Sequence, residues 1–253
     1  MSEVAAVALE GIPEVRPGDD IAALIASAPP PPGDTISGSD VVVIAHKVVS
    51  KAEGRVRRLA DVTPGQQALA LAQEHGKDPR HVQVVLDECQ QLLRAARGVL
   101  ICVTRHGFVC ANAGVDASNA PEPGTLVLLP VDPDASARRI RQGLRIRLGA
   151  APAVVITDSF GRAWRHGQCD VAIGAAGIEP VEDWRGRADA AGRELNATAI
   201  AAADELAAAA DLARSKDGAQ PVVVVRGAGR HVTEADGPGA TALVRPEAED
   251  LFR

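Results

Sequence analysis

Aromatic residues are scarce in this sequence of 253 residues. It has no tyrosine, three phenylalanines and two tryptophans, whereas hydrophobic residues make up 46% of the chain. The core must therefore be built mainly from valine, isoleucine, leucine and alanine. An aliphatic core of this kind favours α/β packing over a β-sandwich.

Positive charge and long apolar segments are also lacking. A formal net charge of −6 and a pI near 5.5 argue against general binding to the phosphate backbone of nucleic acids. The N-terminal residues MSEVAAVALEGIPEV have neither the basic start nor the apolar run of a signal peptide. No segment approaches the ~18 to 20 apolar residues of a membrane span. We expect a cytoplasmic protein without nucleic-acid or membrane partners.

Several familiar motifs are missing. The sequence has no GxxxxGK[ST] motif, and GAG at 227–229 is not a GxGxxG between a strand and a helix. These absences disfavour a P-loop NTPase and an ordinary dinucleotide-binding fold. The four cysteines form no CxxC pair, and no HExxH or HxH occurs. Buried free thiols are therefore a simpler interpretation than a zinc centre or a disulfide framework.

The order of secondary structure predicts a mixed fold. The continuous run VVVIA at 41–45 is typical of a strand covered on both faces. Strands are also predicted at 99–104, 125–130, 153–157 and 221–225. Capping residues and prolines predict helices that begin after Asp19 or Asp20, at Thr63-Pro64 (to about 76), at Asp78-Pro79 (to about 97), at Asp134 and at Arg193 (to about 214). We expect an α/β (α+β mixed) fold with mixed sheets flanked by helices and no P-loop. It would form one domain over 1–253, or two intimate subdomains whose boundary the sequence does not mark.

Polar side chains gather after three of the predicted segments. In open α/β sheets, ligands bind beyond the carboxyl ends of strands. The three sets are Lys47, Ser50, Lys51, Glu53 and Arg55; then Asp116, Ser118 and Asn119; then Thr157, Asp158, Ser159 and Arg162. Two acidic loops could converge on Mg²⁺ or Mn²⁺, with nearby lysines and arginines holding phosphates. Taken singly, each residue is as well explained as a turn, cap or surface residue. Together they suggest nucleotide-phosphate chemistry.

The stretch TDSFGRAWRHGQCDVAIG at 157–174 is the densest of these sets. We predict a single polar loop that follows the strand 153–157 and carries Asp158, Ser159, Arg162, Arg165, His166 and Gln168. The arginine-rich helix 138–147 is most simply a solvated face. Contact with an acidic substrate or with a partner subunit is the alternative.

Read together, several segments resemble the coenzyme F420-0:L-glutamate ligase family. They are GIPEVRPGDDIAALI, DVVVIAHKVVSKAEGR, GVDASN, VVITDSFGRAWRHGQCDVAIGAAGIEP, ELNATAIAAADELAAAADLARSKDGAQPVVVVRG and LVRPEAEDLFR. In some actinobacterial relatives this module is fused, through a tail like the last segment, to a nitroreductase-like domain. The sequence leaves open whether the chain is free-standing or part of such a protein.

The resemblance implies a GTP-dependent ligase that joins L-glutamate to F420-0 and then adds further γ-linked glutamates. It implies two bound divalent ions, Mg²⁺ or Mn²⁺, and allows a monovalent cation in addition. It also implies that the protein is a homodimer. Metal ligands would be Asp116, Asp158 and Ser159, the last in place of the threonine often found in the family. Nucleotide contacts would be Ile12, Pro13, Glu14, Val15, His46, Lys47, Lys51 and Asn119, together with the loop Ser215, Lys216, Asp217, Gly218, Ala219, Gln220, Pro221 and Val222. Asp217 is also a candidate to reach a metal.

Amide formation in water requires an activated acyl group, which the γ-phosphoryl of GTP can supply as an acyl phosphate. Lys51 or Arg162 would steady the phosphoryl oxygens, and Glu53 and His166 are the candidate general bases for the glutamate amine. Two alternatives remain open at this point. One is a nucleotide- or F420-binding module without catalysis, and the other is a metal-dependent GTP phosphohydrolase. The number of glutamates added, the choice of F420-0 or a dehydro precursor as acceptor, and the physiological metal are not determined by the sequence.

Overall fold

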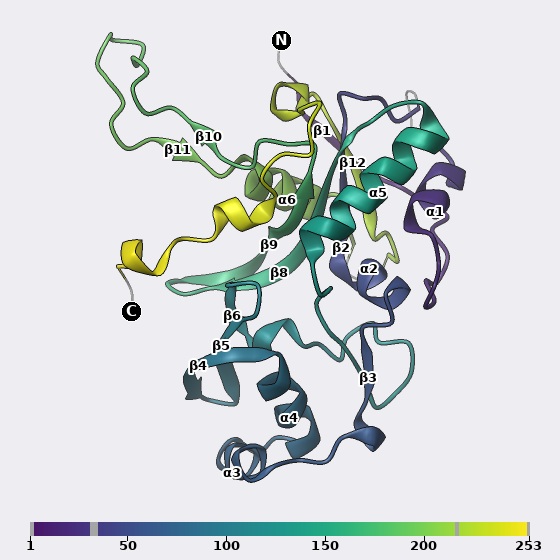
Figure 1. The fold of residues 1–253 in the computed structure, drawn as a ribbon, viewed down its shortest axis with the longest axis vertical. Coiled ribbons are helices and arrows are strands. Elements are labelled where there is room, and N and C mark those ends of the chain that lie inside the picture. Colours follow the sequence, from purple (N-terminus) through teal and green to yellow (C-terminus); the bar gives the residue numbers. More distant parts are fainter. Residues whose placement is uncertain (1–2, 31–34, 216–217, 252–253) are drawn as a thin grey trace.

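A five-stranded mixed sheet forms the centre of the molecule (Figure 1). The computed structural model describes residues 3–30, 35–215 and 218–251. The strands lie in the order β1 (Ala5–Ala8), β12 (Val222–Arg226), β2 (Val41–Ala45), β8 (Ala153–Arg162) and β9 (Arg165–Ala176). β2 and β8 are parallel, and the other neighbours are antiparallel. The predicted mixed α/β class is confirmed.

Helices cover both faces of this sheet. Strand residues alternate between the faces, so Ile44 and Ile156 pack toward α1 (Ile21–Ser27) and α5 (Pro133–Leu148). Val43 and Val155 pack instead toward α6 (Ala202–Leu212). The two central strands therefore have apolar side chains on both faces, as the unbroken run VVVIA predicts.

A region with its own apolar core is inserted between α2 (His46–Ala52) and α5, and it lies below the sheet in Figure 1. Leu100, Cys102 and Leu126 are among the residues at its centre. Its elements are β3 (Val56–Arg58), α3 (Gln66–His75), α4 (Pro79–Glu88), β4 (Cys89–Ala96), β5 (Val99–Thr104), β6 (Val109–Ala111) and β7 (Thr125–Val127). We call residues 56–128 the inserted region.

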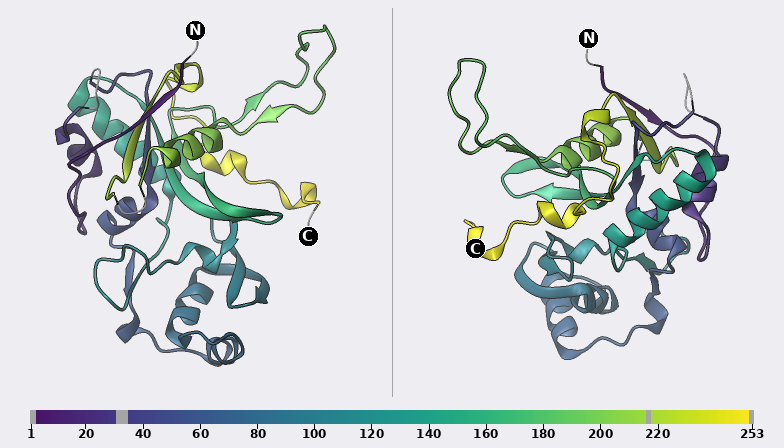
Figure 2. Two further views of the ribbon diagram at one scale, coloured as in Figure 1. Left: turned by 180° about the vertical axis from the view of Figure 1, so that it is seen from behind. Right: turned by 45° about the horizontal axis from the view of Figure 1, so that its top comes forward.

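Two antiparallel projections extend from the sheet. One is the long hairpin of β8 and β9, and the other is an arm that contains β10 (Glu182–Asp183) and β11 (Ala199–Ile200). Figure 2 shows the arm standing well away from the body, while the chain after β12 runs back beside the β8–β9 hairpin. Among its described residues, that last segment contains only short 3₁₀ turns.

Helix boundaries differ from the prediction in four places. The helix predicted from Asp78 to about 97 ends at Glu88, and the chain continues as β4 because residues 97–98 form a two-residue turn with positive φ at both positions. α6 begins at Ala202 rather than at Arg193, since the preceding residues pair across the arm. The N-cap of α5 is Asp132, not Asp134, and the N-cap of α3 is Gly65, not Thr63.

The polar stretch 157–174 is not a loop. It forms the outer parts of β8 and β9, which continue the buried strand out of the sheet as a ladder. Conversely, the strand predicted at 125–130 is shorter and ends at Val127. The predicted cap Asp20 is confirmed, because its carboxylate accepts from Ala23 N at 3.0 Å. Asp78 likewise caps α4.

Candidate functional site

Four chain segments with predicted binding residues meet at one edge of the central sheet. β1, β2 and β8 all end at this edge, and β12 begins there, because β1 and β2 each pair antiparallel with β12 while β8 runs parallel to β2. The loop after β1 holds Ile12–Val15, α2 begins directly after β2, and Asp158 lies at the end of the buried part of β8. We call this place the convergence edge.

Lys47 brings the inserted region to the convergence edge. Its Nζ lies 2.6 Å from Asp116 Oδ2 and 2.5 Å from Ser118 Oγ, and Ser118 also donates to Asp116 through its backbone and hydroxyl. Burial alone would raise the pKa of Asp116, but hydrogen bonds from Lys47 and Ser118 outweigh it and lower that pKa below its ordinary value. Asp116 is therefore held as a carboxylate at the junction of the central sheet and the inserted region.

His46 occupies the first turn of α2 beside the second predicted acid. Its ring is buried, with Nδ1 at 3.2 Å from Ser50 Oγ and Nε2 at 3.3 Å from Asp158 Oδ1. Nε2 makes no hydrogen bond to any residue that the structure describes. The same carboxylate oxygen accepts from the backbone N–H of Ser159 at 2.8 Å. A buried ring nitrogen without a hydrogen-bond partner, facing a carboxylate, is what a ligand site offers.

Lys51 lies one helical turn beyond Lys47. Its side chain is 8% exposed, and its Nζ contacts Glu14 Oε1 at 2.5 Å. Glu14 itself is mostly exposed, while its neighbour Val15 is buried in the core under α1 and α5. The lysine ammonium is thus held at the convergence edge by a carboxylate that solvent reaches.

A buried polar network that the sequence analysis missed supports the other face of β8. Asp170 on β9 accepts from Thr157 Oγ1 at 2.8 Å, from Ser159 Oγ at 2.6 Å and from Arg214 Nη1 at 2.8 Å. Arg214 follows α6 and also donates to the carbonyl of Val43 at 3.1 Å. Burial lowers the pKa of the Arg214 guanidinium, and the nearby Asp170 charge opposes that shift. A lone aspartate inside the apolar run CDVAIG was the sequence signal for this pair.

The carboxylates and hydroxyls at the edge have the chemistry of a site for a divalent cation. Mg²⁺ and Mn²⁺ prefer oxygen donors, which Asp116 and Asp158 supply, and Nε2 of His46 faces Asp158. The predicted ligand Ser159 lies on the opposite face of β8, where its hydroxyl donates to Asp170 at 2.6 Å. Asp116 is occupied here by Lys47. Within the described part of the chain, no group of three or more His, Cys, Asp or Glu side chains is arranged to hold a metal. A cation bound here must therefore complete its shell with hydroxyl, water or substrate oxygens.

Comparison with known families decides the relationship of this chain. The model of the F420-0:Gamma-glutamyl ligase family matches residues 11–227. The chain belongs to this family. The family resemblance inferred from the motifs is therefore confirmed, and the match includes the convergence edge and the whole inserted region.

Individual relatives are similar over nearly their full lengths. The coenzyme F420:L-glutamate ligase of Methanothermobacter thermautotrophicus is 43% identical over 251 residues, which cover 99% of each chain. That of Methanopyrus kandleri is 45% identical over 95% of this chain and 94% of its own. The enzyme of the same name from Haloarcula marismortui is 44% identical over 97% and 94%.

Three of the residues that the sequence predicts to be catalytic in this F420-0:gamma-glutamyl ligase family member lie apart from Asp116 and Asp158. Glu53, at the end of α2, contacts Ser136 and Arg139 of α5, each at 2.5 Å. Arg162 and His166 lie at the exposed tip of the β8–β9 hairpin, where the Arg162 side chain donates to the His166 carbonyl. At about 3.3 Å per strand residue, Arg162 lies roughly 13 Å along the strand from Asp158.

The remaining predicted nucleotide contacts lie near the edge but differ in exposure. Asn119 is exposed and has a positive φ of 54° in the loop after Asp116. The Pro221 carbonyl accepts from Ala45 N at 2.8 Å, so the segment 218–221 reaches β2 next to His46. Val222 is buried in β12, whereas Ser215 is exposed. Two members of this loop, Lys216 and Asp217, lie outside the described residues.

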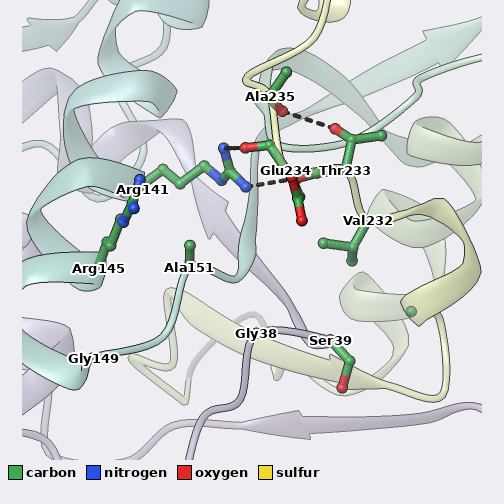
Figure 3. Close-up of a pocket in the computed structure, with 11 residues that line it drawn as sticks. Gly38, Ser39, Arg141, Arg145, Gly149, Ala151, Val232, Thr233, Glu234 and Ala235 are labelled. Carbon is green, nitrogen blue, oxygen red and sulfur yellow. Dashed lines mark hydrogen bonds between the residues drawn. The ribbon is translucent and has the colours of Figure 1, made fainter.

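A further cavity lies at the opposite edge of the sheet. Its volume is about 820 Å³, and it lies between the start of β2, the start of β8 and the chain after β12. Figure 3 shows Arg141 of α5 crossing toward the segment 233–235, where it donates to the carbonyls of Thr233 (2.7 Å) and Glu234 (3.0 Å). Arg141 also pairs with Asp236. This buried arginine ties α5 to the chain after β12, and the cavity contains none of the predicted site residues.

The four cysteines are free, as predicted. Cys102 and Cys110 are buried in the inserted region, and burial together with the nearby Asp158 charge raises the pKa of Cys110 to about 12. These thiols therefore stay protonated and unreactive in the folded protein. No helix among the described residues is long and apolar enough to cross a membrane.

Proposed function

We propose that this chain is an amide-forming ligase that joins L-glutamate to coenzyme F420-0 and then adds further γ-linked glutamates, with GTP and a divalent metal as requirements. Its near-full-length similarity to three archaeal proteins named coenzyme F420:L-glutamate ligase carries the proposal. The convergence edge supports it, because ammonium groups and carboxylates gather there from separate segments.

The chemistry has two balanced steps. In the first, an oxygen of the acceptor carboxylate attacks the γ-phosphorus of GTP, the bond to the bridging oxygen breaks, and GDP leaves. In the second, the glutamate amine attacks the acyl carbon, the bond to the phosphate oxygen breaks, and inorganic phosphate leaves. The amine nitrogen must give up its excess protons, so this step requires a base. Negative charge is redistributed most on the phosphoryl group during its transfer, so positively charged groups must lie close to its oxygens to stabilise the transition state.

Lys47 and Lys51 are the cations that we assign to the phosphates. Each is now held by a carboxylate, Asp116 and Glu14 respectively, and a polyphosphate would replace those partners. Asp116 and Asp158 would hold the divalent ion, whose chemistry is to neutralise charge on the transferring group. Because Asp116 cannot serve Lys47 and a cation equally, binding of both ligands would move Lys47 toward the phosphates.

The role of general base goes to a residue near the acids. Glu53 is engaged by Arg139 and Ser136, and within one chain His166 lies at the far end of the hairpin. His46 is better placed, because its Nε2 is free of hydrogen bonds to described residues and lies 3.3 Å from Asp158 Oδ1. We therefore rank His46 above Glu53 and His166 for proton transfer in this proposal.

The test is a glutamylation assay with resolved product lengths. Protein is incubated with F420-0, GTP, Mn²⁺ and glutamate, and products are read by mass as successive glutamyl increments. Asp158→Ala should abolish these increments without changing the circular dichroism spectrum, and Asp61→Ala, a surface carboxylate of the inserted region, should match the wild type. Full activity in Asp158→Ala would contradict the assignment of this residue. Phosphate release that ignores acceptor and glutamate would favour a phosphohydrolase, and binding without turnover would favour a non-catalytic module.

We also propose that the protein acts as a homodimer. The β10–β11 arm and the β8–β9 hairpin project from the body (Figure 2). The side chain of Trp164, in the turn of the hairpin, is 76% exposed. Large exposed aromatic side chains on projections are typical of contact surfaces. In a dimer, Arg162 and His166 at the hairpin tip could contact the convergence edge of the second copy. Light scattering after size exclusion should give twice the chain mass of 26.1 kDa, and a monomer at assay concentration would overturn this part.

A further inference from the structure

A second cavity, of about 320 Å³, lies beside the convergence edge and has no role in the chemistry described so far. It is an open pocket bounded by the turn before β6, the outer part of β8 and β9, α6, and the chain between residues 243 and 250. Phe108 and Phe160 line it and meet edge to face, with ring centroids 6.2 Å apart. Val171 and Val244 complete an apolar wall. We call this the aromatic pocket.

The aromatic pocket connects with the acid site through one face of β8. Asp158 and Phe160 are two residues apart on the same strand, so their side chains lie on the same face, roughly 7 Å from each other. Opposite them on β9, Val171 pairs with Asp158 and also lines the pocket. A ligand that fills the pocket can therefore extend along this face to Asp158 without crossing the sheet.

Three charged residues line the pocket, Asp204, Arg245 and Asp250, and the first of them offers an open oxygen. Asp204 of α6 accepts the backbone N–H of Ala172 at 2.8 Å through Oδ1, and its Oδ2 has no hydrogen bond to any described residue. Burial raises the pKa of Asp204 above its ordinary value, and the hydrogen bond from Ala172 only partly offsets this. A pocket with aromatic and aliphatic walls and a few polar groups, among them the open oxygen of Asp204, is the usual form of a site for a heteroaromatic ring.

We propose that the aromatic pocket binds the fused deazaflavin ring of the acceptor, with the imide edge of the ring at Asp204 and the side chain directed along β8 to Asp158. This rests on the proposed function and deepens it by naming the acceptor subsite. The volume of the cavity is at the low end of small-molecule pockets, about 300–1,000 Å³. The pocket thus takes the ring system alone, and the ribityl and phospholactyl groups must leave through its mouth.

The charge pattern agrees with this direction of binding. The ring carries an imide N–H, which the open oxygen of Asp204 can accept. The other end of the acceptor carries a phosphodiester and a carboxylate, which Asp204 would repel and which Lys47 and Lys51 at the convergence edge would attract. The reverse orientation would place two anions in a pocket lined by two carboxylates, Asp204 and Asp250, and one guanidinium, Arg245, and would leave the apolar ring in water.

The test uses the deazaflavin riboside, a ring fragment that lacks the phospholactyl group. Binding is followed by the fluorescence of this fragment as protein is added. Phe160→Leu should weaken binding of this fragment about five- to a hundredfold, the range of losses when one stacking ring is removed. Phe160→Tyr, which keeps the ring, should bind as the wild type does. Ile146→Ala, which removes exposed apolar surface on α5, is the matched control.

Steady-state kinetics give an independent measurement. Phe160→Leu should raise the KM for F420-0 by a similar factor and leave the KM values for GTP and glutamate unchanged. Val109→Glu, a change at an exposed residue of the pocket wall, should reproduce the loss if Phe160→Leu does not fold. Unchanged fragment binding in both variants would overturn the pocket assignment even if glutamylation proceeds. Ring binding that depends on Phe160 in a protein without ligase activity would uphold the pocket and refute the proposed function.

Discussion

Replacing Asp170 by alanine should destabilise the fold strongly, because it leaves the guanidinium of Arg214 buried without its counterion. The Asp170 side chain is 4% exposed and that of Arg214 is 8% exposed, with 2.8 Å between Oδ2 and Nη1. Removing one partner of a buried, hydrogen-bonded ion pair costs about 3–5 kcal/mol. The hydroxyls of Thr157 and Ser159 lose their acceptor as well, so we expect the upper part of this range.

The double variant Asp170→Ala/Arg214→Met separates the pair from its surroundings. Removing both charges should restore part of the lost stability, since an apolar pair of similar volume avoids the unpaired charge. The coupling energy between the two sites should therefore exceed about 1 kcal/mol. Asp61→Ala is the control, because Asp61 and Arg58 are mostly exposed, 3.9 Å apart, and should contribute less than about 1 kcal/mol.

The assay is urea unfolding followed by circular dichroism and by tryptophan fluorescence, with coincident transitions required for two-state treatment. A cost below about 1 kcal/mol for Asp170→Ala would refute the reasoning, because it would mean that solvent reaches Arg214. Equal costs for the single and the double variant would show that the packing of β9, and not the charge pair, carries the effect.

Three further predictions concern packing and titration. Gly174→Ala should cost about 1–3 kcal/mol in thermal unfolding, because an added Cβ would lie 2.5 Å from backbone atoms of the first turn of α5, whereas Gly161→Ala on the same hairpin meets nothing within 4 Å and should be far milder. Cys102 and Cys110 should react with an aromatic disulfide reagent only after unfolding, and rapid labelling of either in native protein would contradict their burial. The raised pKa of Asp204 adds stability below the unfolded pKa of about 3.9 that is lost as pH rises through its folded pKa. In wild type, the free energy of unfolding should therefore decline as pH rises through this titration, and Asp204→Asn should remove that decline. Parallel pH profiles of the wild type and the variant would contradict this prediction.

Local sequence rules placed many of the elements. The β-branched runs at 41–45 and 99–104 are strands, and Asp20 and Asp78 cap the helices expected of them. These features depend on neighbours within a few residues, so the sequence is sufficient to predict them. The helix predicted through residue 97 failed because the second half of that segment pairs with β5, and a tertiary ladder outweighs modest helical propensity.

The sequence predicted which residues belong to the candidate site better than it predicted how they are arranged. Asp116, Asp158 and Lys47 were all identified from the sequence, but only the fold shows that the lysine bridges to one acid while its neighbour His46 faces the other. The crowded stretch 157–174 is spread along a hairpin. Its residues Arg162 and His166 therefore lie far from Asp158 on the same chain.

The sequence by itself determined the family, the aliphatic mixed fold and the types of residue at the site, because motifs and side-chain chemistry are properties of short segments. Only the tertiary structure decided which side chains are partners. Asp170 and Arg214 are 44 positions apart in the sequence, and Phe108 and Phe160 are 52 positions apart, yet each pair is in contact. Such contacts depend on strand register and on how the inserted region packs against the sheet, and no local rule contains that information.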